Sequence, residues 1–219
     1  MLRYKCLVLD HDDTAVQSTP AIHFPAFQKT LEQLRPGRQL TLEQFMEYSF
    51  EPGFAALCSD ILGFTPEEMA VQNANWHAVV DHTRAPFWPG MPELVREQKK
   101  RGGLVCVASH SCAANIEQDY KAGCGLLPDA VFGWELGEEQ RKPSPWPLRE
   151  IMRRWGLAPG DLLMVDDLKP GYDMARACGV EFACAGWGVL VPRIAAFMRR
   201  NCDHYFESVD ALRGFLFGG

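Results

Sequence analysis

The sequence lacks several features that would assign it to a class at once. Its eight cysteines form no Cys-x-x-Cys pair, so a structural zinc site is not indicated. No apolar run approaches the roughly 18 residues that span a bilayer. The net charge is −6, whereas a nucleic-acid-binding protein needs a basic face to neutralise phosphates. We therefore expect no membrane and no nucleic acid among its partners.

The first residues also lack the pattern of a secretory signal. The chain opens Met-Leu-Arg-Tyr-Lys and continues directly into an apolar segment typical of a core strand. Several cysteines lie within apolar runs such as Leu104–Ala108, where a reduced cysteine acts as a small hydrophobic side chain. These features predict a reduced, cytoplasmic protein.

Short apolar runs alternate with helical segments along most of the chain. The runs are continuously hydrophobic, as in parallel strands buried on both faces. They are Cys6–Leu9, Leu104–Ala108, Leu162–Val165, Val180–Ala185 and, more weakly, Ala130–Trp134. One helix is predicted to begin at Ser144-Pro145 and another to cover Lys169–Cys178, with Gly179 closing it. This alternation predicts an α/β fold with a parallel sheet between two layers of helices.

The stretch from about Pro20 to Thr83 departs from this alternation. It contains two capping boxes, Thr41–Gln44 and Thr65–Glu68, and no segment with the pattern of a strand. We expect an all-helical subdomain inserted after the first strand. The predicted division is a core of residues 1–17 and 86–219 and a helical cap of residues 18–85.

Several residues whose side chains could take part in catalysis lie after the predicted strands or, for Lys142, in a loop before a predicted helix. They are Asp10, Asp12, Ser109, Lys142, Asp166 and Asp167. Each alone is common in turns and helix caps, but the carboxyl ends of parallel strands meet at one edge of a sheet, where sites form. Four neighbouring carboxylates cannot all stay ionised without a cation, and Mg²⁺ prefers such oxygen ligands. A carboxylate can also attack phosphorus as a nucleophile.

Four ordered motifs resemble those of the haloacid dehalogenase (HAD) superfamily of phosphatases. The first is an apolar run followed by Asp-x-Asp-x-Thr, at Leu7–Thr14. The others are a strand ending in Ser109, a lysine at Lys142 in Lys-Pro-Ser-Pro, and the acidic pair that follows Val165. The order of these motifs, with a helical segment after the first, is similar to that in the helical-cap branch of the superfamily. This branch includes phosphoglycolate phosphatases and β-phosphoglucomutase-like phosphatases. The resemblance implies a Rossmann-like three-layer α/β/α core with an inserted helical cap.

The resemblance also implies a reaction and roles for individual residues. The implied enzyme is a Mg²⁺-dependent phosphatase that hydrolyses a small phosphorylated metabolite through an aspartyl-phosphate. Asp10 would be the nucleophile, and Asp12 would protonate the leaving oxygen and later act as a base. The residues implied to contact phosphate are Thr14, Ser109, His110 and Lys142. Those implied to bind the metal are Asp10, Asp166 and Asp167 with the main chain of Asp12.

The sequence departs from the family pattern in three places. Asp13 stands where a glycine is usual after the second aspartate, and Gln17 replaces a common aspartate at the cap hinge. The cap loop Ser49–Phe54 offers Glu51 and aromatic residues in place of a phosphate-binding arginine. We therefore expect a substrate without a second phosphate, selected by this loop. His23, near the position of a cap histidine in related mutases, is expected to be a helix-surface or hinge residue.

Three other functions stay open on the sequence. A phosphomutase would need a cap group for the non-transferring phosphate, which the sequence does not offer. A phosphonate hydrolase would need a cap lysine, for which Lys29 is the candidate, and a haloacid hydrolase would lack the acidic pair Asp166-Asp167. A non-catalytic binding module would have no need for Asp10 and Asp12. The substrate and the oligomeric state do not follow from the sequence.

Overall fold

A computed structural model describes residues 2–218 and divides the chain into two compact units. The first unit runs to Val16 and resumes at Pro86, and the second is Gln17–Ala85. The assignment of these units as a catalytic core and a cap stays a prediction. Each unit is described by itself below.

The first unit contains a six-stranded sheet with the order β3-β2-β1-β4-β5-β6, in which every pair of neighbours is parallel. The strands are β1 Cys6–Leu9, β2 Leu104–Ala108, β3 Ala130–Phe132, β4 Leu162–Asp166, β5 Glu181–Ala185 and β6 His204–Phe206. The α/β class and the parallel sheet predicted from the apolar runs are confirmed.

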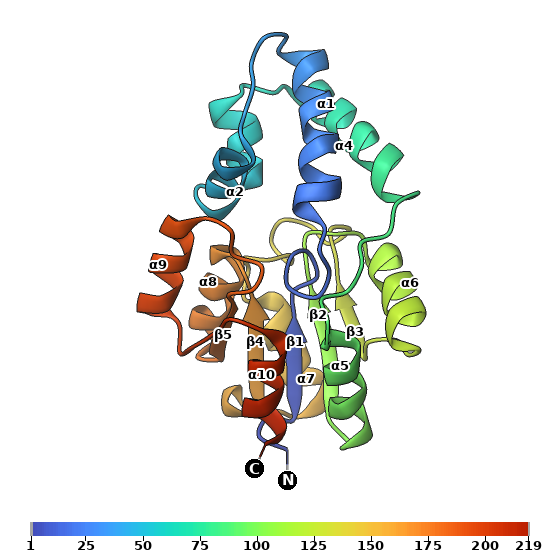
Figure 1. The fold of residues 1–219 in the computed structure, drawn as a ribbon, viewed down its shortest axis with the longest axis vertical. Coiled ribbons are helices and arrows are strands. Elements are labelled where there is room, and N and C mark those ends of the chain that lie inside the picture. The colour runs from blue at the N-terminus through green and yellow to red at the C-terminus, as the bar shows by residue number, and fades with distance from the viewer. Residues whose placement is uncertain (1, 219) are drawn as a thin grey trace. The chain divides into compact units, whose positions relative to one another are not determined.

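Helices cover both faces of this sheet (Figure 1). They are α5 Met91–Lys100, α6 Ala113–Cys124, α7 Trp146–Trp155, α8 Lys169–Cys178, α9 Pro192–Asn201 and α10 Val209–Phe217. Leu7 and Leu9 of β1 pack with side chains of α5, α6 and α10 in one buried cluster. On the other side Tyr172 of α8 packs edge-on against Phe182 of β5 and Phe197 of α9. Because both faces are covered, the strands carry continuous rather than alternating apolar residues.

All of the regular secondary structure in the second unit, Gln17–Ala85, is helical. Its elements are η1 Thr19–His23, α1 Phe24–Leu34, α2 Leu42–Phe50, α3 Phe54–Ala56, η2 Leu57–Ile61 and α4 Pro66–Val80. Both predicted capping boxes form, at the first turns of α2 and α4. Phe27 and Phe45 belong to its buried core and Phe54 packs partly buried against them, with ring centroids 5.0 to 6.3 Å apart. The predicted all-helical character is confirmed.

Two local predictions were wrong. The strand β6 was missed, because its three residues are half-buried at the edge of the sheet and form no long apolar run. The helix α7 begins at Trp146 rather than at Pro145, although the Ser144 hydroxyl still accepts a hydrogen bond from the Trp146 amide at 3.3 Å. Within residues 2–218, no helix combines the length and the apolar character needed to cross a membrane.

Candidate active site

The two central strands bring three carboxylates together. The strand order reverses between β1 and β4, and in open parallel sheets ligands bind beyond the carboxyl ends of the strands at such a point. Asp10 follows β1, Asp166 ends β4, and Asp167 comes next. Oxygens of these three side chains all lie within 4.8 Å of one another, and the residues are at most 4% exposed.

Lys142 supplies a positive charge to this cluster. Its Nζ donates hydrogen bonds to Oδ1 of Asp10 and to Oδ2 of Asp166, each at 2.7 Å. The lysine comes from the long loop between β3 and α7, and only 6% of the residue is exposed. The structure therefore joins three of the four predicted motifs through direct contacts.

Three carboxyl groups share one ammonium in this cluster, so ionising all three would leave negative charge that Lys142 cannot neutralise. Burial raises the pKa of Asp166 to about 7; Lys142 opposes the rise and the charge of Asp10 adds to it. The pKa of Asp167 is also raised well above its usual range, by burial and then by the charges of Asp166, Asp13 and Asp10. Burial alone would lower the pKa of Lys142, but Asp10 and Asp166 raise it, so the amine stays charged.

Neighbouring groups fix the two carboxylates at the end of β4. Oδ1 of Asp166 accepts the amide hydrogen of Leu168 at 2.8 Å. Helix α8 passes so close that a Cβ at Gly171 would lie 2.1 Å from Oδ2 of Asp166, which explains the glycine. Thr14, predicted to contact phosphate, donates its hydroxyl to Oδ1 of Asp167 at 3.1 Å. In this structure the threonine therefore orients a carboxylate.

The side chain of Asp12 stands apart from the three clustered carboxylates. Its Oδ2 accepts a hydrogen bond from the Ser111 hydroxyl at 2.6 Å, and the Ser109 hydroxyl accepts the Ser111 amide at 3.2 Å. The loop after β2 thus orients the residue predicted to act as acid and base. Ser111 was missed in the sequence, although its spacing of two from Ser109 was a usable signal.

Asp13, which stands where the family usually has glycine, adopts a backbone conformation that glycine favours. Asp13 has a φ of +56°, a left-handed conformation in which glycine is the residue under least strain. Its carbonyl accepts the indole N–H of Trp88, and the next carbonyl, of Thr14, accepts that of Trp187, each at 3.0 Å. Gly188 also packs closely against this loop, since a Cβ there would lie 2.1 Å from the main-chain carbonyl oxygen of Asp13. The loop is compact despite the missing glycine.

His110 follows Ser109 and lies beside the lysine loop. Its Nε2 is 2.6 Å from the carbonyl oxygen of Lys142, and its ring meets that of Trp134 edge-on. Burial, then the positive charge of Lys142, lowers the pKa of His110 to about 4. A direct contact between His110 and phosphate stays a prediction.

The donor set of the cluster fits a hard divalent cation. The three clustered groups are all carboxylates, and the pKa of Asp166 and of Asp167 is raised first by burial and in part by the neighbouring carboxylates. A divalent cation with a preference for oxygen ligands would relieve this repulsion, and Mg²⁺ is the one that commonly binds carboxylates together with substrate phosphate. Asp10, Asp166 and Asp167 are the residues that could hold it.

The candidate residues of the helical unit differ in their contacts and in their exposure to solvent. The indole N–H of Trp76 donates to Nδ1 of His23 at 3.0 Å, and the two rings stack. Glu51 is exposed, as is Lys29 on α1. Phe54 is partly buried and packs against Phe27 and Phe45 of the core of the unit, so part of its ring is held by these contacts.

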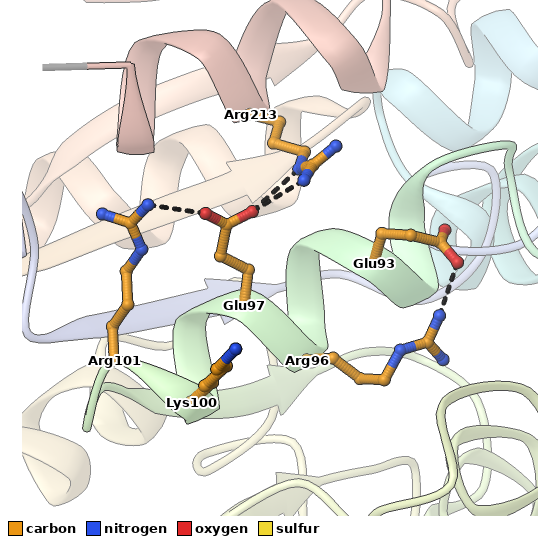
Figure 2. Close-up of a pocket in the computed structure, with 6 residues that line it drawn as sticks. All are labelled: Glu93, Arg96, Glu97, Lys100, Arg101 and Arg213. Atoms are coloured by element: carbon orange, nitrogen blue, oxygen red, sulfur yellow. Dashed lines mark hydrogen bonds and ion pairs between the residues drawn. The ribbon is translucent and has the colours of Figure 1, made fainter.

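A hollow elsewhere on the first unit contains none of the predicted site residues. It has a volume of about 640 Å³ and is lined by Glu93, Arg96, Glu97, Lys100, Arg101 and Arg213. Figure 2 shows that both acids of this lining pair with arginines: Glu93 with Arg96, and Glu97 with Arg101 and Arg213. Its acids are already occupied by arginines, so we place the active site at the carboxylate cluster.

Buried carboxylates beyond the strand ends of a parallel sheet, where its strand order reverses, are typical of the active site of an α/β enzyme. The chain belongs to the haloacid dehalogenase-like hydrolase family, whose family model matches residues 4–179. The family predicted from the four motifs is confirmed, and with it the assignment as a hydrolase.

Comparisons with individual proteins agree with this family. The chain is 30% identical over 139 residues to a bifunctional riboflavin kinase/FMN phosphatase of Arabidopsis thaliana. That match covers 55% of this chain and only 36% of the length of the relative.

Solved structures of similar fold cover nearly the whole chain. A predicted phosphoglycolate phosphatase from Haemophilus somnus has a TM-score of 0.74 at 17% identity, covering 98% of this chain and 99% of its own. CbbY from Rhodobacter sphaeroides, in complex with xylulose-(1,5)bisphosphate, has a TM-score of 0.71 at 19% identity, covering 94% and 95%. At these identities the likeness shows the fold, including the inserted helical unit.

Proposed function

We propose that this protein is a Mg²⁺-dependent phosphatase that hydrolyses a small phosphorylated metabolite through an aspartyl-phosphate on Asp10. The observation that carries the proposal is the buried cluster in which the Lys142 ammonium bridges Asp10 and Asp166, with Asp167 beside them. Family membership supports the same chemistry.

In the first step, a carboxylate oxygen of Asp10 attacks the phosphorus atom. The bond from phosphorus to the leaving oxygen breaks, and Asp12 gives that oxygen a proton. In the second step, water attacks the phosphorus of the aspartyl-phosphate, Asp12 takes its proton, and the Asp10 carboxylate is regenerated. Ser111 orients Asp12 for both transfers through its 2.6 Å hydrogen bond.

Charge on the phosphoryl oxygens must be stabilised while the bonds rearrange. Lys142 and the Ser109 hydroxyl are the proposed phosphate contacts of the protein. Asp10, Asp166 and Asp167 would hold Mg²⁺, which when bound would supply further positive charge to stabilise the phosphoryl group. Thr14 would act through Asp167, which it already contacts.

The substrate is proposed only as a class. The FMN phosphatase relative and the phosphoglycolate phosphatase neighbour support a phosphate monoester of a small metabolite. The exposed Glu51 in the cap loop disfavours a second phosphate at that position, and with it a phosphomutase. The test is phosphate release from a panel of metabolite monoesters that includes FMN and phosphoglycolate, with Mg²⁺ present. Absence of release from every ester in the panel would contradict the proposal.

Metal binding should be visible in the thermal stability. In the metal-free protein the folded-state pKa of Asp166 and Asp167 lies above the unfolded value, so the folded state binds more protons and its stability falls as pH rises from about 4 through 7. Mg²⁺ competes with those protons. We therefore expect Mg²⁺ to raise Tm more at pH 8 than at pH 5.5, measured by scanning calorimetry after EDTA treatment.

A matched pair of variants separates site binding from general ion effects. Asp167→Asn removes a carboxylate of the cluster, whereas Asp60→Asn removes an exposed one in the helical unit. The Mg²⁺-dependent rise in Tm should be lost in the first variant and kept in the second. An equal rise in both would show that the ion does not bind at the cluster.

We also propose that the helical unit selects the substrate while the first unit performs the chemistry. Glu51 is the better residue to test, because it is exposed whereas Phe54 packs against core residues of the unit and its loss would remove those contacts. Glu51→Gln should change KM and the ranking of substrates, with kcat for a small generic phosphate ester within about twofold. A loss of generic ester hydrolysis in Glu51→Gln would mean that this loop contains a catalytic group.

A further inference from the structure

The ring of His110 makes a contact that the proposed chemistry leaves unexplained. Nε2 lies 2.6 Å from the main-chain carbonyl oxygen of Lys142, 32 residues further along the chain. A carbonyl oxygen only accepts hydrogen bonds, so Nε2 carries the hydrogen and donates it. The hydrogen bond ties the end of β2 to the backbone of the residue whose side chain reaches Asp10 and Asp166.

This contact determines what the other ring nitrogen can do. Because burial and the nearby Lys142 charge lower the pKa of His110 to about 4, the ring is neutral near pH 7. With its hydrogen on Nε2, the neutral ring has a lone pair on Nδ1. A lone pair cannot donate to a phosphate oxygen, which argues against a direct phosphate contact by His110.

The main-chain hydrogen bonds on either side of Lys142 are local. They run from the Arg141 amide to the Gly137 carbonyl and from the Ser144 amide to the Arg141 carbonyl. The start of the loop is held at Trp134, whose amide donates to the Ser111 carbonyl. The His110 ring packs edge-on against Trp134 with centroids 5.9 Å apart, so it contacts the loop at two points.

We infer that His110 is a positioning residue, whose Nε2–H anchors the main chain of Lys142 and so holds the ammonium between Asp10 and Asp166. The inference rests on the proposed function, because the consequence for activity requires Lys142 to act on the phosphoryl group. The anchoring itself has a consequence that does not depend on catalysis, namely how readily the loop opens.

Two substitutions separate the two ring nitrogens. The amide nitrogen of glutamine reaches nearly the place of Nε2 in histidine, whereas that of asparagine reaches the place of Nδ1. His110→Gln therefore keeps the donor to the Lys142 carbonyl, and His110→Asn loses it. The two variants differ by one methylene group, so each is the control of the other.

In phosphate-release assays we expect His110→Gln to keep kcat within about threefold of the wild type. His110→Asn should lower kcat by roughly tenfold with little change in KM, because a displaced ammonium matters most in the transition state. A phosphate ligand at Nδ1 would give the opposite order, with asparagine the better replacement.

Limited proteolysis measures the anchoring without any assay of activity. Trypsin can cut the Arg141–Lys142 bond only when the loop opens, and the Arg38–Gln39 bond in the helical unit is an internal standard. Cleavage after Arg141, followed by mass spectrometry, should be roughly fivefold faster in His110→Asn than in His110→Gln, whose rate should match the wild type. Cleavage after Arg38 should be equal in all three.

The outcomes distinguish this inference from the proposed function. If the wild type releases no phosphate but the proteolysis order holds, the proposed function fails and the anchoring stands. If the wild type is active while both variants open at the wild-type rate or at the same raised rate, the hydrogen bond does not hold the loop and the inference is overturned. Better activity in His110→Asn than in His110→Gln overturns it as well.

Discussion

Asp10→Asn should reduce phosphate release by roughly 10³-fold or more, because an amide cannot form the acyl phosphate that begins the reaction. The substitution is nearly isosteric, and the amide oxygen can still accept the Lys142 hydrogen bond that Oδ1 accepts now at 2.7 Å. It also removes one negative charge from a crowded cluster. We therefore expect the variant to fold, with circular dichroism and Tm close to those of the wild type, so that the loss is chemical.

Asp12→Asn gives the contrasting result. Its carboxylate lies outside the cluster and is oriented by Ser111, so its role is proton transfer. Activity should fall less for an ester with a strong leaving group than for an alkyl phosphate, since a good leaving group needs little protonation.

Wild-type turnover in Asp10→Asn, or a phosphorylated peptide from a residue other than Asp10, would refute the assignment of the nucleophile.

The sequence predicted the framework of the site because its signals are local. A continuous apolar run predicts a strand buried on both faces, and parallel strands place their carboxyl ends together. Asp10, Ser109 and Asp166 could therefore be assigned to one edge of the sheet from the order of residues alone. Both capping boxes and the glycine after α8 were similarly local and were found where expected.

The details that escaped prediction depend on contacts across the fold. Nothing near Thr14 in the sequence shows that its hydroxyl bonds to Asp167, 153 residues away. The indole N–H groups of Trp88 and Trp187 donate to the carbonyls of Asp13 and Thr14, and these contacts appear only in three dimensions. Side-chain direction within a loop depends on such partners, which no sequence period encodes.

Lys142→Met should be the most damaging substitution for stability among those discussed. It leaves Asp10 and Asp166 buried without their shared cation, and breaking a buried ion pair by removing one partner costs about 3–5 kcal/mol. Activity should also fall by at least about 100-fold, because a cation at the transferring phosphoryl group is lost. Urea denaturation of the metal-free protein at pH 8, alongside phosphate release, measures both effects.

The loss of stability should depend on pH with a sign that follows from the carboxylates. Without Lys142 the folded-state pKa of Asp166 rises further above its unfolded value, so the folded variant binds extra protons and loses more stability as pH increases. Lys142 itself stays charged throughout this range in the wild type. The difference in free energy of unfolding between variant and wild type should therefore be larger at pH 8 than at pH 5.

Lys5→Met provides the matched control, because it removes a lysine from an ion pair at the surface. Lys5 lies 3.0 Å from Asp161 with 65% of its side chain exposed, and such pairs contribute about 0–1 kcal/mol. Its free energy of unfolding should change little and show no added dependence on pH between 5 and 8. If Lys142→Met were as mild as Lys5→Met, the carboxylates would not need the ammonium, and the charge balance inferred for the site would be wrong.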